Sequence, residues 1–125
     1  MKKFLIVDDE IGWRNHHTNV IKNIINYAQI NTADSAKSAY DILLQQKDFD
    51  VIITDMQMER AFLPKYDGEW LIEQIKTFPK YNNTKIIIIS AAENIRNIAT
   101  KYNVECIPKQ TAITCLSAYK EIINN

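Results

Sequence analysis

The chain has 125 residues, 46% of them hydrophobic, and its fifteen basic side chains are balanced by fifteen acidic ones. This length and apolar content predict one domain over residues 1–125, with a single core and no linker. A neutral balance without a dense run of either sign disfavours direct binding to nucleic acid or to a membrane surface. The N-terminal apolar run stops at Asp8, and no stretch approaches transmembrane length. We therefore expect a soluble, cytoplasmic protein.

Apolar runs and amphipathic helical patterns alternate along the chain. Strands are expected over residues 4–7, 28–33, 51–55, 85–89 and 104–107. Helices are expected over about residues 13–27, 35–44, 68–78, 93–102 and 111–123. Five strands and five helices in strict alternation predict an α/β fold, in which a parallel sheet is covered by helices on both faces through right-handed crossovers.

The segment from Val51 to Asp55 is the centre of the functional prediction, because four apolar or β-branched residues end there in a carboxylate. An unbroken run of this kind is typical of a strand that is covered on both faces. Open α/β sheets bind their ligands at the carboxyl ends of strands, which makes Asp55 a candidate site residue. Alternatively, Asp55 only opens a turn, since Asp is common after strands. The ends of the other strands are needed to decide.

Polar side chains also follow the other strands. Asp8 and Asp9 come after the first strand, Ser90 ends the fourth and Lys109 follows the fifth. In a doubly wound sheet of order 2-1-3-4-5 the first and third strands are neighbours, so that the three carboxylates converge. Clustered carboxylates repel one another unless a cation lies among them, and hard oxygen ligands favour magnesium. The sequence therefore predicts a Mg²⁺ site beside a hydroxyl and an ammonium group.

Other residues that often bind metals show no such pattern. Cys106 and Cys115 have no metal-ligand spacing and are expected to be reduced, mostly packed thiols. His16 and His17 are neighbours on the first helix and point in different directions, which favours surface or packing roles over a shared metal.

In this order and at these strand ends, Asp8, Asp9, Asp55, Ser90 and Lys109 resemble the receiver domain of two-component response regulators. The similarity covers essentially the whole chain and implies a flavodoxin-like three-layer sandwich. It also implies that Asp55 is the phosphoacceptor, that Ser90 hydrogen-bonds the phosphoryl group and that Lys109 pairs with it.

The same resemblance implies how the metal is held and who the partners are. Asp8 and Asp9 would bind Mg²⁺ directly or through water, together with Asp55 and the backbone carbonyl of Gln57. A carboxylate can attack phosphorus to give an acyl phosphate, helped by alignment and charge neutralisation. The phosphoryl group would come from a histidine kinase or a phosphotransfer protein, and a downstream protein or output domain would read the change. The expected function is a phosphorelay switch that catalyses only its own phosphorylation and dephosphorylation.

Two alternatives remain open. In the family a proline usually follows the lysine, whereas here Pro108 precedes Lys109 and Gln110 follows it; Cys106 stands where the family often has Tyr or Phe. These departures motivate a degenerate receiver that binds partners without phosphorylation. A flavodoxin-like enzyme or cofactor binder is disfavoured, because the chain has two glycines and no glycine-rich phosphate loop.

The connection from the third strand to the next helix spans residues 56–67, which makes it longer than the two to six residues that commonly join a strand to a helix. One interpretation is a solvated surface loop. The other is that Phe62, Leu63 and Tyr66 cover Asp55 or contact a partner, and thereby alter the lifetime of the phosphoryl group. Gln57 and Ala92 lie at positions that tune hydrolysis of the acyl phosphate in the family.

Trp13, just past the acidic pair, also has two interpretations. It lies in a region where receiver domains meet the histidine-bearing helices of kinases or phosphotransfer proteins, which suggests a docking role. It also fits a role in core packing, and the sequence does not choose between them.

Overall fold

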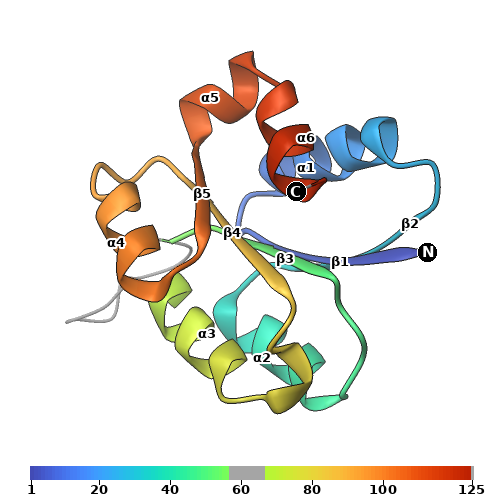
Figure 1. The fold of residues 1–125 in the computed structure, drawn as a ribbon, viewed down its shortest axis with the longest axis vertical. Coiled ribbons are helices and arrows are strands. Elements are labelled where there is room, and N and C mark those ends of the chain that lie inside the picture. The colour runs from blue at the N-terminus through green and yellow to red at the C-terminus, as the bar shows by residue number, and fades with distance from the viewer. Residues whose placement is uncertain (57–66, 125) are drawn as a thin grey trace.

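The computed structural model describes residues 1–56 and 67–124, and residues 57–66 and 125 lie outside the described part. One parallel sheet runs through the middle of the molecule with the strand order β2-β1-β3-β4-β5 (Figure 1). The strands are β1 (Lys2–Val7), β2 (Ala28–Ala33), β3 (Val51–Thr54), β4 (Lys85–Ser90) and β5 (Glu105–Pro108). The expected sheet and its order are confirmed, with each strand within two residues of its expected bounds.

Six α-helices and one 3-10 helix are present in the described part of the chain. They are α1 (Ile11–Ile24), α2 (Ala36–Leu44), α3 (Asp67–Lys76), η1 (Pro79–Tyr81), α4 (Ile95–Tyr102), α5 (Lys109–Thr114) and α6 (Ser117–Ile123). Helices α1, α5 and α6 cover one face of the sheet, and α2, α3 and α4 cover the other (Figure 1). The expected three-layer α/β sandwich is confirmed.

Apolar side chains from β1 pack on both faces of the sheet. Phe4 and Ile6 join the core under α1 and α6, whereas Leu5 and Val7 join the core under α2 and α3. Successive strand residues point to opposite faces, so a strand covered on both sides needs an apolar residue at every position. This requirement explains the uninterrupted apolar runs in β1, β3 and β4, which end only where the polar site begins.

The C-terminal helix differs from its expected form. A single helix was expected over residues 111–123, but the chain forms α5 and α6, separated at Cys115, whose φ of −133° and ψ of 85° lie outside the helical region. The sequence around the break, Thr111 to Thr114, is rich in β-branched residues, which have low helix propensity. The described residues therefore contain six α-helices instead of the expected five, because the last expected helix is divided in two.

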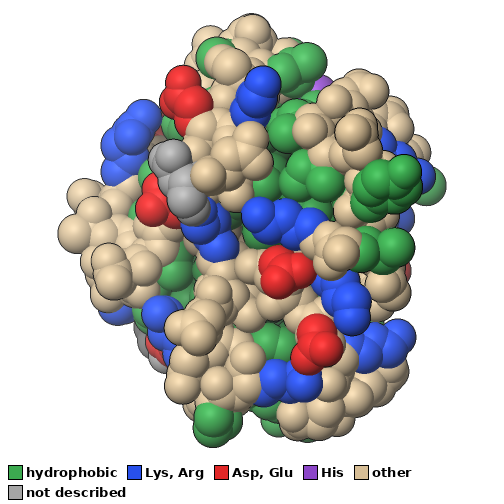
Figure 2. Space-filling view, turned by 45° about the vertical axis from the view of Figure 1, so that its right-hand side comes forward, with side chains coloured by type: hydrophobic (Ala, Val, Ile, Leu, Met, Phe, Trp, Pro, Cys, Tyr) green, Lys and Arg blue, Asp and Glu red, His purple; other side chains and the backbone are tan. Residues whose placement is uncertain are grey.

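The surface carries mixed charge. On the face drawn in Figure 2, acidic side chains lie among basic ones. Near the amino end of the sheet, for example, Asp48 lies 2.8 Å from the Lys80 ammonium and 3.9 Å from that of Lys3. Within the described residues, no helix combines the length and the apolar character needed to cross a membrane.

Candidate functional site

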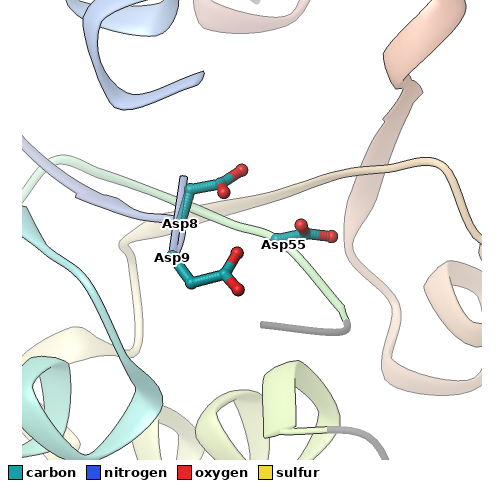
Figure 3. A group of neighbouring side chains, drawn as sticks. All are labelled: Asp8, Asp9 and Asp55. Atoms are coloured by element: carbon teal, nitrogen blue, oxygen red, sulfur yellow. The ribbon is translucent and has the colours of Figure 1, made fainter. Parts of the chain in front are cut away.

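The acidic cluster is built by two neighbouring strands. Val7 of β1 pairs with Thr54 of β3, and the backbone amide of Asp55 donates a hydrogen bond to the Val7 carbonyl at 3.1 Å. This pairing places the residues after both strand ends side by side. Oxygens of Asp8, Asp9 and Asp55 lie within 4.8 Å of one another, and Figure 3 shows the three carboxyl groups gathered at the ends of their strands.

Asp8 is the most buried of the three carboxylates, with none of its surface exposed. Its Oδ1 accepts a hydrogen bond from the Glu10 amide at 3.0 Å, whereas its Oδ2 accepts no well-oriented hydrogen bond among the described residues and has the Lys109 ammonium, 3.2 Å away, as its ion-pair partner. Burial, assisted by the negative charge of Asp55, raises the pKa of Asp8 to about 6, against the opposing effects of the Glu10 amide and Lys109. The fold therefore holds a carboxylate that lacks full compensation for its charge.

Asp55 is also buried, and each of its oxygens has one hydrogen-bond partner among the described residues. Oδ1 accepts a hydrogen bond from the Met56 amide at 2.6 Å, and Oδ2 accepts one from the Lys109 ammonium at 2.8 Å. These two contacts fix the orientation of the carboxylate at the end of β3.

Lys109 reaches this cluster from the end of β5, which is separated from β3 by β4 in the sheet. Strand β5 runs through Pro108, and helix α5 begins directly at Lys109. The ammonium group lies 2.8 Å from Oδ2 of Asp55 and 3.2 Å from Oδ2 of Asp8. Burial opposes its charge, but the hydrogen bond and charge of Asp55, together with Asp8, raise the pKa of Lys109 above its ordinary value. The departure at Pro108 and Gln110 therefore does not keep the ammonium from the site.

Ser90 is the last residue of β4 and is buried. Its hydroxyl accepts a hydrogen bond from the Ala92 amide at 3.1 Å, so that it helps to shape the turn that follows the strand. Ser90 pairs with Pro108, the residue before Lys109, in the register of β4 and β5. It therefore lies at the same edge of the sheet as the three carboxylates.

Gly68 is a residue of this site whose importance sequence reasoning missed. Its amide donates a hydrogen bond to the Met56 carbonyl at 2.8 Å, which joins the start of α3 to the residue after Asp55. A Cβ atom at Gly68 would lie 2.1 Å from the Asp55 carbonyl oxygen and 2.7 Å from the Met56 Cα. The sequence indicated only that Gly68 opens a helix, and nothing in its spacing reveals this close approach.

Several expected features lie outside the described residues or stay predictions. Gln57, with its expected metal-binding carbonyl, and Phe62, Leu63 and Tyr66, with their expected cover, fall within residues 57–66. Cys106 is half-buried, and burial raises the pKa of its thiol. Trp13 is half-buried and packs against the core under α1, which agrees with its packing interpretation, while the docking role stays a prediction.

The acidic cluster fits a divalent cation. It offers carboxylate oxygens from three residues, and one of them, Oδ2 of Asp8, is buried with no well-oriented hydrogen bond among the described residues and only the Lys109 ammonium, at 3.2 Å, to balance its charge. Hard oxygen donors suit Mg²⁺, which usually retains water and binds proteins through one or two carboxylates. Asp8, Asp9 and Asp55 are the described residues that would hold it.

The chain belongs to the response regulator receiver domain family, whose model matches residues 4–120. The chemotaxis protein CheY homolog of Campylobacter jejuni is 29% identical over 91 residues, which are 70% of this chain and 63% of that protein. This chain therefore spans less than two thirds of the length of that curated relative. The family match leaves the flavodoxin-like cofactor binder without support.

Solved receiver structures share the fold. A response regulator receiver domain protein from Clostridium thermocellum is 26% identical, with a TM-score of 0.74 over 99% of this chain and 95% of that one. The response regulator TrrA from Thermotoga maritima, solved in complex with Mg²⁺ and BeF, is 20% identical, with a TM-score of 0.69 over 93% of this chain and 99% of that one.

Proposed function

We propose that the chain is a single cytoplasmic receiver domain in which Asp55 accepts a phosphoryl group from a histidine kinase or a phosphotransfer protein. The observation that carries this proposal is the position of Asp55, a buried carboxylate held 2.8 Å from the Lys109 ammonium and gathered with Asp8 and Asp9. The family match over residues 4–120 supports it. TrrA, which shares this fold, was solved in complex with Mg²⁺ and BeF, and this agrees with a magnesium-dependent reaction.

The chain's own residues would divide the work of the transfer. An oxygen of the Asp55 carboxylate forms the new bond to phosphorus, while the bond from phosphorus to the donor atom breaks and its electron pair leaves with the donor. The Lys109 ammonium neutralises charge on the phosphoryl oxygens, and Ser90 supplies a hydroxyl donor from the end of β4. Bound Mg²⁺, held by Asp8, Asp9, Asp55 and the Gln57 carbonyl, would supply further charge neutralisation.

The product would act as a switch. A phosphoryl group adds negative charge and acceptor oxygens next to Lys109 and Ser90, so that the turn after β4 can be drawn inward and repositioned. The change would be read by a downstream protein, or by an output domain, on the surface formed by α4, β5 and the C-terminal helices α5 and α6. No direct contact with nucleic acid or membrane is part of this proposal.

The test is intact mass after incubation with acetyl phosphate and Mg²⁺. We expect one phosphoryl increment in the wild-type protein and none in Asp55→Asn or in the presence of a chelator. A receiver of known activity, labelled in parallel, shows that the donor is competent. A folded wild-type protein that gains no increment under these conditions would instead support the degenerate receiver that binds partners without phosphorylation.

A further inference from the structure

The indole ring of Trp13 lies against the active-site ammonium. The Lys109 Nζ is 4.8 Å from the centre of this ring, a distance at which an aromatic face attracts a cation. Trp13 comes from α1 and Lys109 from the start of α5, so the contact joins two helices on the same face of the sheet. Neither interpretation of Trp13 from the sequence, docking or core packing, includes this contact.

The ring completes the surroundings of the ammonium group. An ammonium has three N–H donors, and here two carboxylate oxygens, from Asp55 at 2.8 Å and Asp8 at 3.2 Å, approach it. The Lys109 side chain is only 10% exposed, which leaves little room for water on its remaining side. The face of Trp13 therefore takes a place that water occupies around an exposed lysine. Because the ring offers no ligand to a metal, this contact does not compete with a cation for the carboxylate oxygens.

The ring is itself supported by neighbouring side chains. Its centre lies 5.4 Å from the rings of both His16 and His17. His16 donates from Nε2 to the Ala112 carbonyl of α5 at 3.1 Å, and His17 is hydrogen-bonded through Nδ1 to the Tyr119 hydroxyl of α6 at 2.8 Å. The two histidines thus form hydrogen bonds to different C-terminal helices, and together they tie the Trp13 ring to both of these helices.

We propose that Trp13 is a positioning residue that holds the Lys109 ammonium against Asp55 through its aromatic face. This inference rests on the proposed function, because it assigns the ring a part in phosphoryl transfer to Asp55. If Trp13 only packed against the core, an apolar side chain of similar volume would serve as well, and its aromatic face would not be needed. Replacement by Leu, which keeps apolar volume, and by Phe, which keeps an aromatic face, therefore separates the two roles.

The first measurement concerns the contact alone and needs neither metal nor phosphodonor. In the metal-free protein, we expect the NMR signals of the Lys109 ε-methylene protons, assigned by their loss in Lys109→Arg, to be shifted upfield by the indole ring current. Trp13→Leu should return them to the range of exposed lysines, whereas Trp13→Phe should keep part of the shift. Trp70→Leu, which removes a tryptophan from α3 on the other face of the sheet, should leave them unchanged.

The second measurement is the rate at which acetyl phosphate labels Asp55 in the presence of Mg²⁺. Trp13→Leu should slow labelling by about three- to tenfold, and Trp13→Phe by no more than about twofold, with similar thermal midpoints.

The proposal is overturned if the wild-type Lys109 signals show no upfield shift, a result that does not depend on any variant folding. It is also overturned if Leu and Phe variants are labelled at the same rate. If the wild-type protein is not labelled at all, the proposed function fails, and the NMR shift alone then decides whether Trp13 holds Lys109.

Discussion

Gly68→Ala is expected to destabilise the protein by about 3 kcal/mol and to slow phosphorylation of Asp55. The added Cβ would lie 2.1 Å from the Asp55 carbonyl oxygen, and the other nearest atoms also belong to the backbone of Asp55 and Met56. No side-chain rotamer can relieve such a contact, so the start of α3 or the backbone after β3 must move. Either movement strains the hydrogen bond from Gly68 to the Met56 carbonyl and displaces the phosphoacceptor.

The chain offers a matched control in its other glycine. Gly12 lies in α1, is exposed, and has no heavy atom within 4 Å of the position of an added Cβ. Gly12→Ala should therefore stabilise the protein by about 0.4–1 kcal/mol, because alanine lowers the conformational entropy of the unfolded chain. Urea unfolding of both variants, monitored by circular dichroism, measures the two effects. Equal stability changes in the two variants would contradict the steric role of Gly68.

Much of the fold follows from patterns that the sequence displays directly. The β-branched runs of β3 and β4 are long enough, and uniform enough, to require cover on both faces, and helical periodicity between the strands supplies that cover. Because parallel strands share one carboxyl edge, the positions of Asp8, Asp55 and Lys109 after their strands were sufficient to predict that they meet. Their observed contacts, 2.8 Å and 3.2 Å from the lysine, confirm this prediction.

The remaining features depend on how elements pack, which periodicity does not encode. The contact of Trp13 with Lys109 requires α1 and α5 to lie at a particular separation on the same face of the sheet. The approach of Gly68 to Asp55 depends on where the chain returns after residues 57–66. The break at Cys115 reflects weak helix propensity in competition with tertiary packing, and no single residue marks it.

Asp8→Asn is expected to make the metal-free protein more stable than the wild type by about 2–3 kcal/mol at pH 7.5. In the fold the pKa of Asp8 is raised from its ordinary value of 3.8 to about 6, chiefly by burial. A raised pKa means that folding favours the neutral carboxyl group, so its contribution to stability is fully present below pH 3.8 and is lost as the pH rises through about 6. At pH 7.5 the ionised Asp8 therefore costs free energy, at about 1.4 kcal/mol for each pKa unit. An asparagine remains neutral and avoids this cost.

Excess Mg²⁺ should reverse this order, so that the wild type becomes more stable than Asp8→Asn. A cation that binds only the folded protein stabilises it in proportion to the logarithm of its concentration, and Asp8→Asn removes one of the carboxylates that would hold the cation. Urea unfolding with a chelator and with excess Mg²⁺, at pH 7.5 and at pH 4, tests both parts. The advantage of the variant should disappear at pH 4, where Asp8 is largely protonated, and in excess Mg²⁺ the wild type should gain more.

Asp9→Asn is the control, because Asp9 is exposed and its charge is solvated, so the metal-free stability should change less. The prediction is contradicted if the metal-free Asp8→Asn protein unfolds at a lower urea concentration than the wild type at pH 7.5. That result would show that the ion pair between Asp8 and Lys109 stabilises the fold by more than burial of the Asp8 charge destabilises it. Asp8 would then need no cation to be held in the fold.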